Sequence, residues 1–178
     1  MRFPLRQSKV SRLAGFSLVE LMVVLAISTI LMTIAIPSFK TFIDRQKVTT
    51  VASDLYASVA FTRAEAIRRG ARVYLLPKDG LTWESGWVVQ TDLTNAATIV
   101  YSRDAVPTRL LVTPSFDPDN SDLYLAYDGN GRTPSKSNGL VVRSGSWNIA
   151  IGVEQRNLVI NKLGRPYLCD PAKTSPCP

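Results

Sequence analysis

The feature that most constrains this chain is an apolar run near its start, GFSLVELMVVLAISTILMTIAIP, which extends from Gly15 to Pro37. The run contains one acidic residue, Glu20, and no other charged residue. As an α-helix rising ~1.5 Å per residue, residues 16–37 would extend roughly 33 Å, enough to cross the hydrocarbon core of a bilayer. The run therefore predicts a membrane-spanning helix.

The segment before this run, MRFPLRQSKVSRLAG, carries four basic residues and no acidic residue. The positive-inside rule keeps such a segment in the cytoplasm and places the rest of the chain on the other side of the membrane. An ordinary secretory signal is cleaved after its apolar stretch, whereas here the small pair Ala14-Gly15 stands before it. We therefore expect an exported chain that keeps its apolar helix as an anchor.

The helical pattern continues beyond Pro37, where the missing backbone donor predicts a kink. Apolar residues then recur at the three-and-four spacing of an amphipathic helix, among them Phe42, Val48, Val51, Leu55 and Val59. Two arginines followed by Gly70 predict the end of this helix. One helix of about fifty residues is predicted, with a membrane half at 16–37 and an amphipathic half at 38–70.

Short runs rich in β-formers, separated by Gly, Pro, Asn and Asp, follow Gly70. The predicted strands are 72–76, 86–90, 98–101, 110–112, 123–127, 140–143, 147–153 and 158–161. The Pro-rich end, from Pro166 onward, is predicted to be a tail. Residues 71–178 are therefore expected to form a single globular, antiparallel β-sheet domain packed on the helix, which makes the fold class α+β.

Charge is distributed unevenly along the chain. The formal charge is +7, but the N-terminal segment supplies four of these positive charges, which leaves +3 for the rest. Residues 79–128 hold two arginines against eight acidic residues, whereas residues 129–178 hold seven basic residues against two acidic ones. The C-terminal part is the basic part of the exported domain.

The residues give little support to catalysis or to a cofactor. The chain has no histidine, no obvious serine-lysine motif, and no P-loop lysine after the glycines near Gly129. The acidic run 117–128 partly matches a calcium loop, but Asp122 stands where that loop needs glycine and Asp128 where it needs glutamate. We expect no enzyme, no cofactor and no metal site.

Two tryptophans and two cysteines are further candidates. Trp83 and Trp87 could stack on bases or sugars, but aromatic residues in short strands more often pack in a core, so we expect core residues. Outside the cytoplasm, Cys169 and Cys177 are expected to close a short disulfide loop worth about 2 to 3 kcal/mol, with two free thiols as the alternative.

Four features at fixed spacing resemble the class III signal of type IV pilins and of the pseudopilins of type II secretion. They are a basic leader ending in Gly15, then Phe16, then Glu20, then an apolar helix interrupted by Pro37. In that family a prepilin peptidase of the inner membrane cleaves after the glycine and methylates the new N-terminus. The resemblance implies that residues 1–15 are a leader and that Phe16 becomes the first residue.

Glu20 has two interpretations. An acid within a membrane segment costs about 2.5 to 3.5 kcal/mol, and a capping box with Ser17 would account for it. The pilin resemblance implies instead that Glu20 pairs with the amine of Phe16, in its own or a neighbouring subunit, during assembly. The two roles can coexist, and we favour the assembly role.

The helix end FTRAEAIRRG, the run WESGWVVQTD, and LAYDGNGR followed by NLVINKLGRPYLC look like the GspH/FimT branch of pilin-like proteins. That branch has a long N-terminal helix under two β-sheets. The resemblance implies a minor pilin, held in the inner membrane by a single span and then assembled at low copy with other major and minor pilins, in a tip or initiation complex. Its C-terminal domain is expected to be periplasmic or extracellular.

Two alternatives stay open. One is a minor pseudopilin of type II secretion, although the short loop from Cys169 to Cys177 resembles the disulfide-closed ends of pilins. The other is a membrane-tethered binding module that never assembles, in which Glu20 is only a cap.

Some members of this branch bind DNA through a basic C-terminal segment with a Gly-Arg-x-Arg motif. Here Gly164-Arg165-Pro166-Tyr167 keeps the first arginine and loses the second. The resemblance nevertheless makes Lys162, Arg165 and Lys173 candidate DNA-binding residues. The alternative is a solvated basic face that only keeps the domain soluble.

Overall fold

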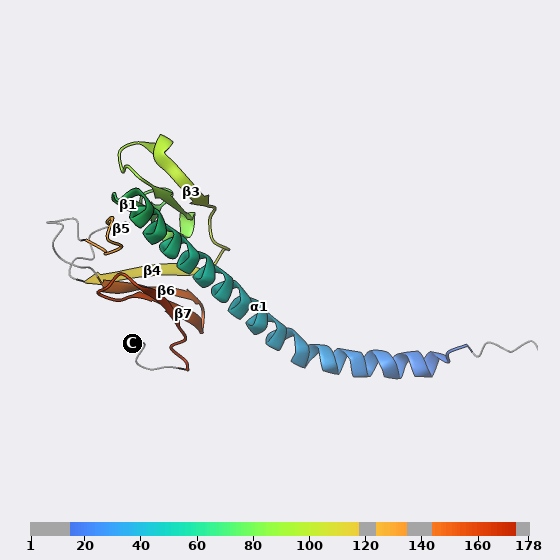
Figure 1. The fold of residues 1–178 in the computed structure, drawn as a ribbon. Coiled ribbons are helices and arrows are strands. Elements are labelled where there is room, and N and C mark those ends of the chain that lie inside the picture. The colour runs from blue at the N-terminus through green and yellow to red at the C-terminus, as the bar shows by residue number, and fades with distance from the viewer. Residues whose placement is uncertain (1–14, 118–123, 135–143, 174–178) are drawn as a thin grey trace, which may run out of the picture. The chain divides into compact units, whose positions relative to one another are not determined.

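The computed structural model describes residues 15–117, 124–134 and 144–173. These residues form one long helix and two four-stranded antiparallel sheets (Figure 1). The chain divides into two compact units, Met1–Lys40 and Thr41–Pro178.

Helix α1 extends from Leu18 to Arg69, 52 residues, which confirms the predicted long helix. It ends because Gly70 adopts a left-handed φ of 61°, which glycine tolerates without strain. In this turn the Gly70 amide donates to the Ile67 carbonyl at 3.2 Å, and the Ala71 amide to the Ala66 carbonyl at 3.3 Å. The predicted helix end is therefore confirmed, and these two bonds satisfy two of the carbonyl groups in the last turn of the helix.

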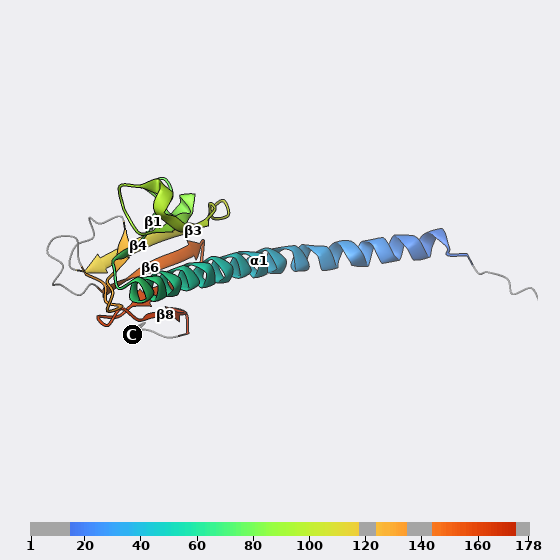
Figure 2. The same cartoon turned by 45° about the horizontal axis from the view of Figure 1, so that its top comes forward.

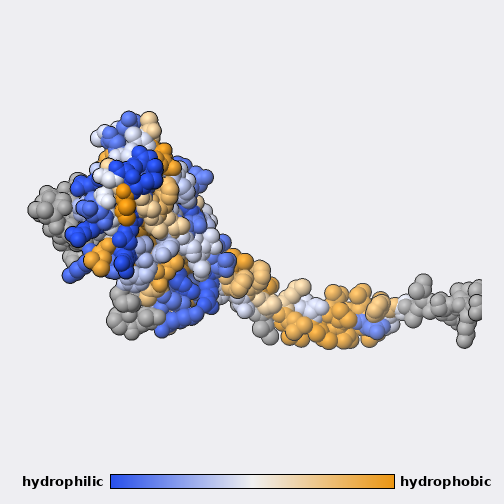
Figure 3. Space-filling model, viewed as in Figure 1, coloured by the Kyte–Doolittle hydropathy of each residue, from blue (hydrophilic) through white to orange (hydrophobic). Residues whose placement is uncertain are grey.

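The part of α1 in the first unit exposes large apolar side chains on all its sides. Figure 3 shows them as a hydrophobic segment, and among them Leu25 is 57% and Ile30 63% exposed. By length and hydropathy, no single straight helix among the described residues qualifies as a membrane span. The two segments of α1, Leu18–Thr33 and Ser38–Arg69, qualify only as a pair, as a span that is bent at a break between them. The break at residues 34–37 includes Pro37, where the sequence predicts a kink.

The second unit contains both sheets, and the C-terminal half of α1 runs along them (Figure 2). Sheet A has the order β3-β2-β1-β5 and sheet B the order β4-β6-β7-β8. The strands of sheet A are β1 (Val73–Pro77), β2 (Trp87–Gln90), β3 (Ile99–Arg103) and β5 (Leu125–Tyr127). Those of sheet B are β4 (Leu111–Asp117), β6 (Ser144–Ile151), β7 (Glu154–Ile160) and β8 (Pro166–Cys169). Two 3₁₀ turns, η1 (Trp83–Ser85) and η2 (Ala96–Thr98), connect strands of sheet A.

The core joins one stripe of α1 to the inner faces of both sheets. Its largest fully buried side chains include Leu55, Trp87, Tyr127 and Trp147. The indole Nε1 of Trp87 donates to the hydroxyl of Ser58 on α1 at 2.7 Å, which ties sheet A to the helix. Trp83 packs edge to face on Trp147, with ring centroids 5.1 Å apart.

Both tryptophans that the sequence singled out are therefore core residues, as predicted, because Trp83 is 2% and Trp87 0% exposed. Trp83 lies in η1 and not in a strand. Neither indole ring is available as a platform for stacking ligands.

Seven predicted strands coincide with observed strands, and the predicted strand 140–143 lies outside the described residues. The predicted tail from Pro166 is wrong, because residues Pro166–Cys169 form β8 at the edge of sheet B. Proline is accepted there because it is the first residue of an edge strand, where a missing amide donor interrupts little of the ladder. β8 pairs with β7 in the register Leu158↔Leu168 and Val159↔Tyr167.

Candidate processing segment and candidate basic site

Gly15 and Phe16, between which cleavage is predicted, lie just before α1, outside regular secondary structure. A Cβ atom added to Gly15 would meet no atom within 4 Å, so nothing in the described structure requires glycine at this position. The following Phe16 is 84% exposed. An exposed, non-helical segment is the kind of backbone that a peptidase can bind.

Glu20 and Ser17 form the capping box that the sequence predicts. The Glu20 amide donates to the Ser17 hydroxyl at 3.1 Å, and the Ser17 amide donates to Glu20 Oε2 at 3.5 Å. The second of these bonds is long, so the carboxylate is only weakly held by its own helix. Capping is thus observed, whereas pairing of Glu20 with the amine of Phe16 stays a prediction.

The basic half of the chain contains two turns with the same geometry, 128–132 after β5 and 161–165 after β7, here called the twin turns. In the first, Asp128 Oδ1 accepts from the amides of Asn130 and Arg132, each at 2.9 Å. Asn161 Oδ1 accepts from the corresponding amides of Leu163 and Arg165, each at 3.0 Å.

Each turn is also closed by two backbone hydrogen bonds between equivalent positions. The fourth residue is a glycine with left-handed φ, 71° at Gly131 and 72° at Gly164. The fifth residue is an arginine in both turns, Arg132 and Arg165.

The twin turns lie against each other. A Cβ atom added to Gly164 would stand 2.7 Å from the Gly131 carbonyl oxygen, so only glycine allows this approach. The Gly164 carbonyl accepts a hydrogen bond from the Tyr127 hydroxyl at 2.8 Å, and the Gly131 carbonyl accepts one from Arg63 Nε at 3.0 Å. Burial raises the pKa of Tyr127, which keeps its hydroxyl protonated and able to donate.

The structure brings together two of the three candidate DNA-binding residues. Lys162 and Arg165 are exposed on the second twin turn, and Arg132 is exposed on the first. Lys173 instead lines a separate cleft beside Arg156. Arg156 forms an ion pair with Asp170 at 3.2 Å.

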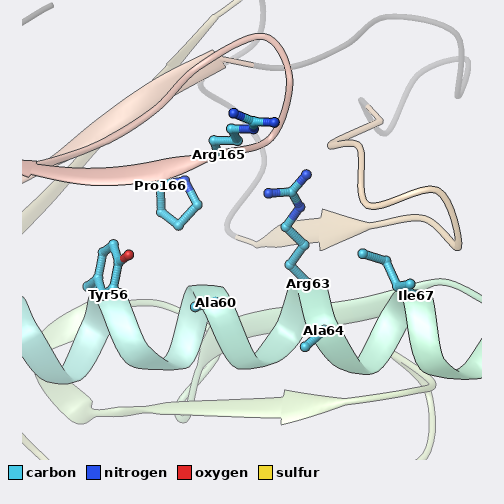
Figure 4. A pocket seen from close by; sticks show the side chains of 7 residues that line it. All are labelled: Tyr56, Ala60, Arg63, Ala64, Ile67, Arg165 and Pro166. Atoms are coloured by element: carbon cyan, nitrogen blue, oxygen red, sulfur yellow. The ribbon is translucent and has the colours of Figure 1, made fainter.

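A shallow cleft of about 400 Å³ lies between α1 and the second twin turn (Figure 4). Its residues are Tyr56, Ala60, Arg63, Ala64, Ile67, Arg165 and Pro166. Figure 4 shows the Arg63 side chain extending from the helix towards the turn that carries the Arg165 side chain. The cleft therefore combines an apolar helix surface with two guanidinium groups. Arg63, Arg132, Lys162 and Arg165 are here called the basic site.

Arg68 and Arg69, at the end of α1, bind Glu65. The Arg68 guanidinium donates to both Glu65 oxygens, at 2.6 and 2.8 Å, and Arg69 Nε also donates to this carboxylate. The hydrogen bonds from Arg68 and then Arg69 lower the pKa of Glu65 from 4.5 to about 2. The Glu65 carboxylate therefore partly balances the positive charge of these two arginines.

Sequence reasoning did not include Arg63 in the basic site and did not recognise the twin turns. A signal for the turns exists, because DGNGR and NKLGR share Asp or Asn at the first position, glycine at the fourth and arginine at the fifth. No comparable signal exists for Arg63, which joins the site through its hydrogen bond to Gly131 and through the cleft that it shares with Arg165.

The predicted disulfide stays a prediction, because Cys177 lies outside the described residues. Cys169 is buried at the end of β8, 7% exposed. The centre of the acidic run 117–128 also lies outside the described residues. Among those that are described, no three His, Cys, Asp or Glu side chains are grouped as metal ligands.

Two family models match the chain. One, described as type II transport protein GspH, matches residues 51–164, and the other, a prokaryotic N-terminal methylation motif, matches residues 11–36. No curated protein matches the chain.

The fold is similar to that of a solved protein, the type IV minor pilin FimU of Pseudomonas aeruginosa strain PAO1, at 18% sequence identity. One of its crystal forms gives a TM-score of 0.56 over 72% of this chain and 97% of FimU. A second form gives 0.59 over 76% and 97%. The likeness shows the fold alone, a long helix followed by antiparallel sheets, and confirms the predicted α+β class.

Proposed function

The chain belongs to the GspH family, and from this membership we propose that it is a minor type IV pilin, cleaved after Gly15 and assembled at low copy into a pilus. The observation that carries the proposal is the methylation motif at residues 11–36, placed directly on the apolar start of a helix whose second half is the spine of a folded domain. The likeness to FimU in fold agrees with it.

The exposed apolar half of α1 supports a two-stage role for this helix. Its large side chains find no cover within the described chain, so they need lipid first and the helices of neighbouring pilins afterwards. In the proposal the protein spans the inner membrane once, with the sheets on the periplasmic side, and then enters the fibre. Glu20 would pair with the new amine of Phe16, in its own or a neighbouring subunit.

The proposal requires a prepilin peptidase as the first partner. Gly15→Val is expected to block maturation, because a branched side chain obstructs the site at which the peptidase opens the backbone. The measurement is the intact mass of the purified protein, in which a methylated N-terminal Phe16 replaces residues 1–15. Leu13→Val, which places the same side chain two residues earlier, is the matched control and should mature normally.

If Gly15→Val matured at the normal rate, the assigned cleavage site would be wrong. An unprocessed leader in the wild-type protein would instead favour the membrane-tethered binding module that does not assemble.

A minor pseudopilin of type II secretion is the second candidate within the same fold, and the description of the matching GspH family favours it. The two differ in what is lost when the gene is deleted. A pilin deletion reduces surface pili and leaves secretion intact, whereas a pseudopilin deletion does the reverse. Recovery of the protein in sheared pili would support the pilin.

DNA binding is an additional candidate activity, supported by the contact between the twin turns. That contact gathers the exposed Arg132, Lys162 and Arg165 on neighbouring backbone segments. Such a cluster suits the phosphate backbone, which is bound through charge and without reading sequence.

A gel-shift titration of the full chain in zwitterionic detergent tests this activity. Arg165→Ala and Lys162→Ala should each weaken binding for all sequences and reduce the salt slope by about one contact. Lys173→Ala, which removes a cation from the other cleft, is the control and should have little effect. No shift at low salt, or a shift that neither twin-turn variant changes, would remove DNA from the proposed function.

A further inference from the structure

The outward face of sheet B carries no charged residue over three successive rows, and most of the residues in these rows are polar. Trp147, Ile149, Leu158 and Ile160 point into the core, so the residues that alternate with them point outward. By strand register these rows are Ser115-Ser146-Val159-Tyr167, Thr113-Asn148-Asn157-Cys169 and Leu111-Ala150-Gln155, of which Cys169, at the end of β8, is buried. None of these residues is charged, in a chain of which 20% is charged.

A hollow of about 720 Å³ lies at one end of this face. Its polar lining side chains come from Ser115, Ser144, Ser146, Asn157, Asn161 and Tyr167. Among the described residues that line it, Lys162 is the only charged one. The hollow is within the size range of sites for small ligands.

The polar side chains around the hollow are held in place. Asn148 Nδ2 donates to Asn157 Oδ1 at 2.8 Å and to Gln155 Oε1 at 3.2 Å, which orients neighbouring carboxamides on one face. Asn161 is fixed by the second twin turn. Groups that are already ordered lose less conformational entropy when they bind a ligand.

We propose that this hollow binds a neutral oligosaccharide. Hydroxyl and carboxamide groups donate and accept hydrogen bonds, as sugar hydroxyls require, and the Tyr167 ring offers an apolar surface for the C–H face of a sugar ring. Nucleic acid would need several cations here, and the described lining provides one, Lys162.

The proposal rests on sheet B and on two residues of the second twin turn, Asn161 and Lys162, and goes beyond assembly and DNA binding. The test uses the full chain in a zwitterionic detergent that contains no sugar. Maltopentaose, cellopentaose and the pentamer of N-acetylglucosamine are the three probes, which separate glucans of two linkages from an amino-sugar polymer. Binding is followed by saturation-transfer NMR and by isothermal titration calorimetry.

We expect at least one probe to bind, with an affinity that does not change between 50 mM and 500 mM salt, because a neutral ligand releases no counterions. Tyr167→Ala should weaken binding about tenfold through the lost ring contact. Tyr101→Ala, which removes an exposed tyrosine from sheet A, should leave the affinity unchanged.

A charge placed in the hollow gives a second, matched comparison. Ser115 and Thr113 are both exposed on β4 and point to the same side, but only Ser115 lines the hollow. Ser115→Lys should therefore weaken binding about tenfold or more, because the ammonium group fills the hollow and must be desolvated, whereas Thr113→Lys should not. Arg165→Ala, in the basic site, should also leave sugar binding unchanged.

Three results would overturn the proposal. They are binding of none of the three probes, equal effects of Ser115→Lys and Thr113→Lys, and an affinity that falls steeply with salt. Loss of sugar binding leaves the pilin assignment untouched, because the mass of the processed N-terminus is measured separately.

Discussion

The two halves of α1 have the same secondary structure and opposite surroundings. In the second half, Val51, Leu55 and Val59 are at most 1% exposed, because the two sheets cover one stripe of the helix. In the first half, Leu25 and Ile30 are more than half exposed although they are equally apolar. One half is therefore stabilised by its own domain, and the other needs apolar partners from outside the chain.

The carboxylates of Glu65 in the second half and Glu20 in the first half also differ in whether their partners come from the same domain. Glu65 is 7% exposed and receives hydrogen bonds from Arg68 and Arg69. Glu20 has a weak bond to its own helix start and no cation as a partner among the described residues. The Glu65 carboxylate, which is paired with cations of its own domain, stabilises that domain. The Glu20 carboxylate, which has no such partner in an apolar helix, is suited to bind a cation from outside the described chain.

The largest expected effect tests this contrast directly. Leu55→Ala should lower the free energy of unfolding of the globular unit by about 3 kcal/mol, because it leaves a cavity between α1 and the sheets. Leu25→Ala makes the same chemical change in the first half and should alter that free energy by less than about 0.5 kcal/mol. Urea unfolding in detergent, followed by the fluorescence of the buried tryptophans, measures both.

If both substitutions lowered the free energy of unfolding equally, the first half of α1 would also be packed within the domain, which would contradict the contrast. If only Leu25→Ala lowered it, the first half and not the second would be the packed one.

Substitutions of Glu20 are expected to have a smaller effect, but they separate its role as a helix cap from the role of its negative charge. Glu20→Ala should leave the globular unit folded and cleavage after Gly15 intact, yet reduce incorporation into sheared pili several-fold, because the amine of Phe16 loses its partner. Glu20→Gln keeps an acceptor for the Ser17 amide but has no charge. It should therefore fail in assembly as Glu20→Ala does.

If Glu20→Gln were incorporated normally and Glu20→Ala were not, assembly would need Glu20 only as a helix cap. If Glu20→Ala were also incorporated normally, assembly would need neither the cap nor the pairing with the amine of Phe16.

The sequence predicts α1 and most strands well because their signals are local. A continuous apolar run, a three-and-four spacing and Gly70 each act within a few residues of the structure they determine. The local pattern does not predict β8, because a proline at 166 indicates the start of a tail. A strand can begin at Pro166 because it lies at the edge of sheet B, which is a property of the whole sheet.

The two candidate sites also differ in whether their signals are local in the sequence. The candidate processing segment could be predicted from its resemblance to the pilin signal, since Gly15, Phe16 and Glu20 are close in sequence. The basic site could not, because it depends on Gly164 approaching Gly131 and on Arg63 reaching across from the helix. Contacts between residues far apart in sequence arise from packing, which no local pattern specifies.

The smallest expected effect concerns the pH dependence of the second half of α1. The pKa of Glu65 is about 2 in the folded chain and 4.5 in its ordinary state, because Arg68 and Arg69 stabilise the charged form. A lowered pKa means that the unfolded chain binds the proton more readily. The stabilisation is therefore complete above about pH 4.5 and is lost as the pH falls towards 2.

Glu65→Gln removes this contribution while keeping the size of the side chain. The variant should be less stable than the wild-type protein at pH 7, and the two free energies of unfolding should converge between pH 4.5 and 2. Leu25→Ala is the control, and its curve should follow the wild-type curve throughout. A constant difference between Glu65→Gln and wild type down to pH 2 would show that the carboxylate acts by packing. Convergence would instead identify its ion pairs as a pH-dependent stabiliser that the first half of the helix lacks.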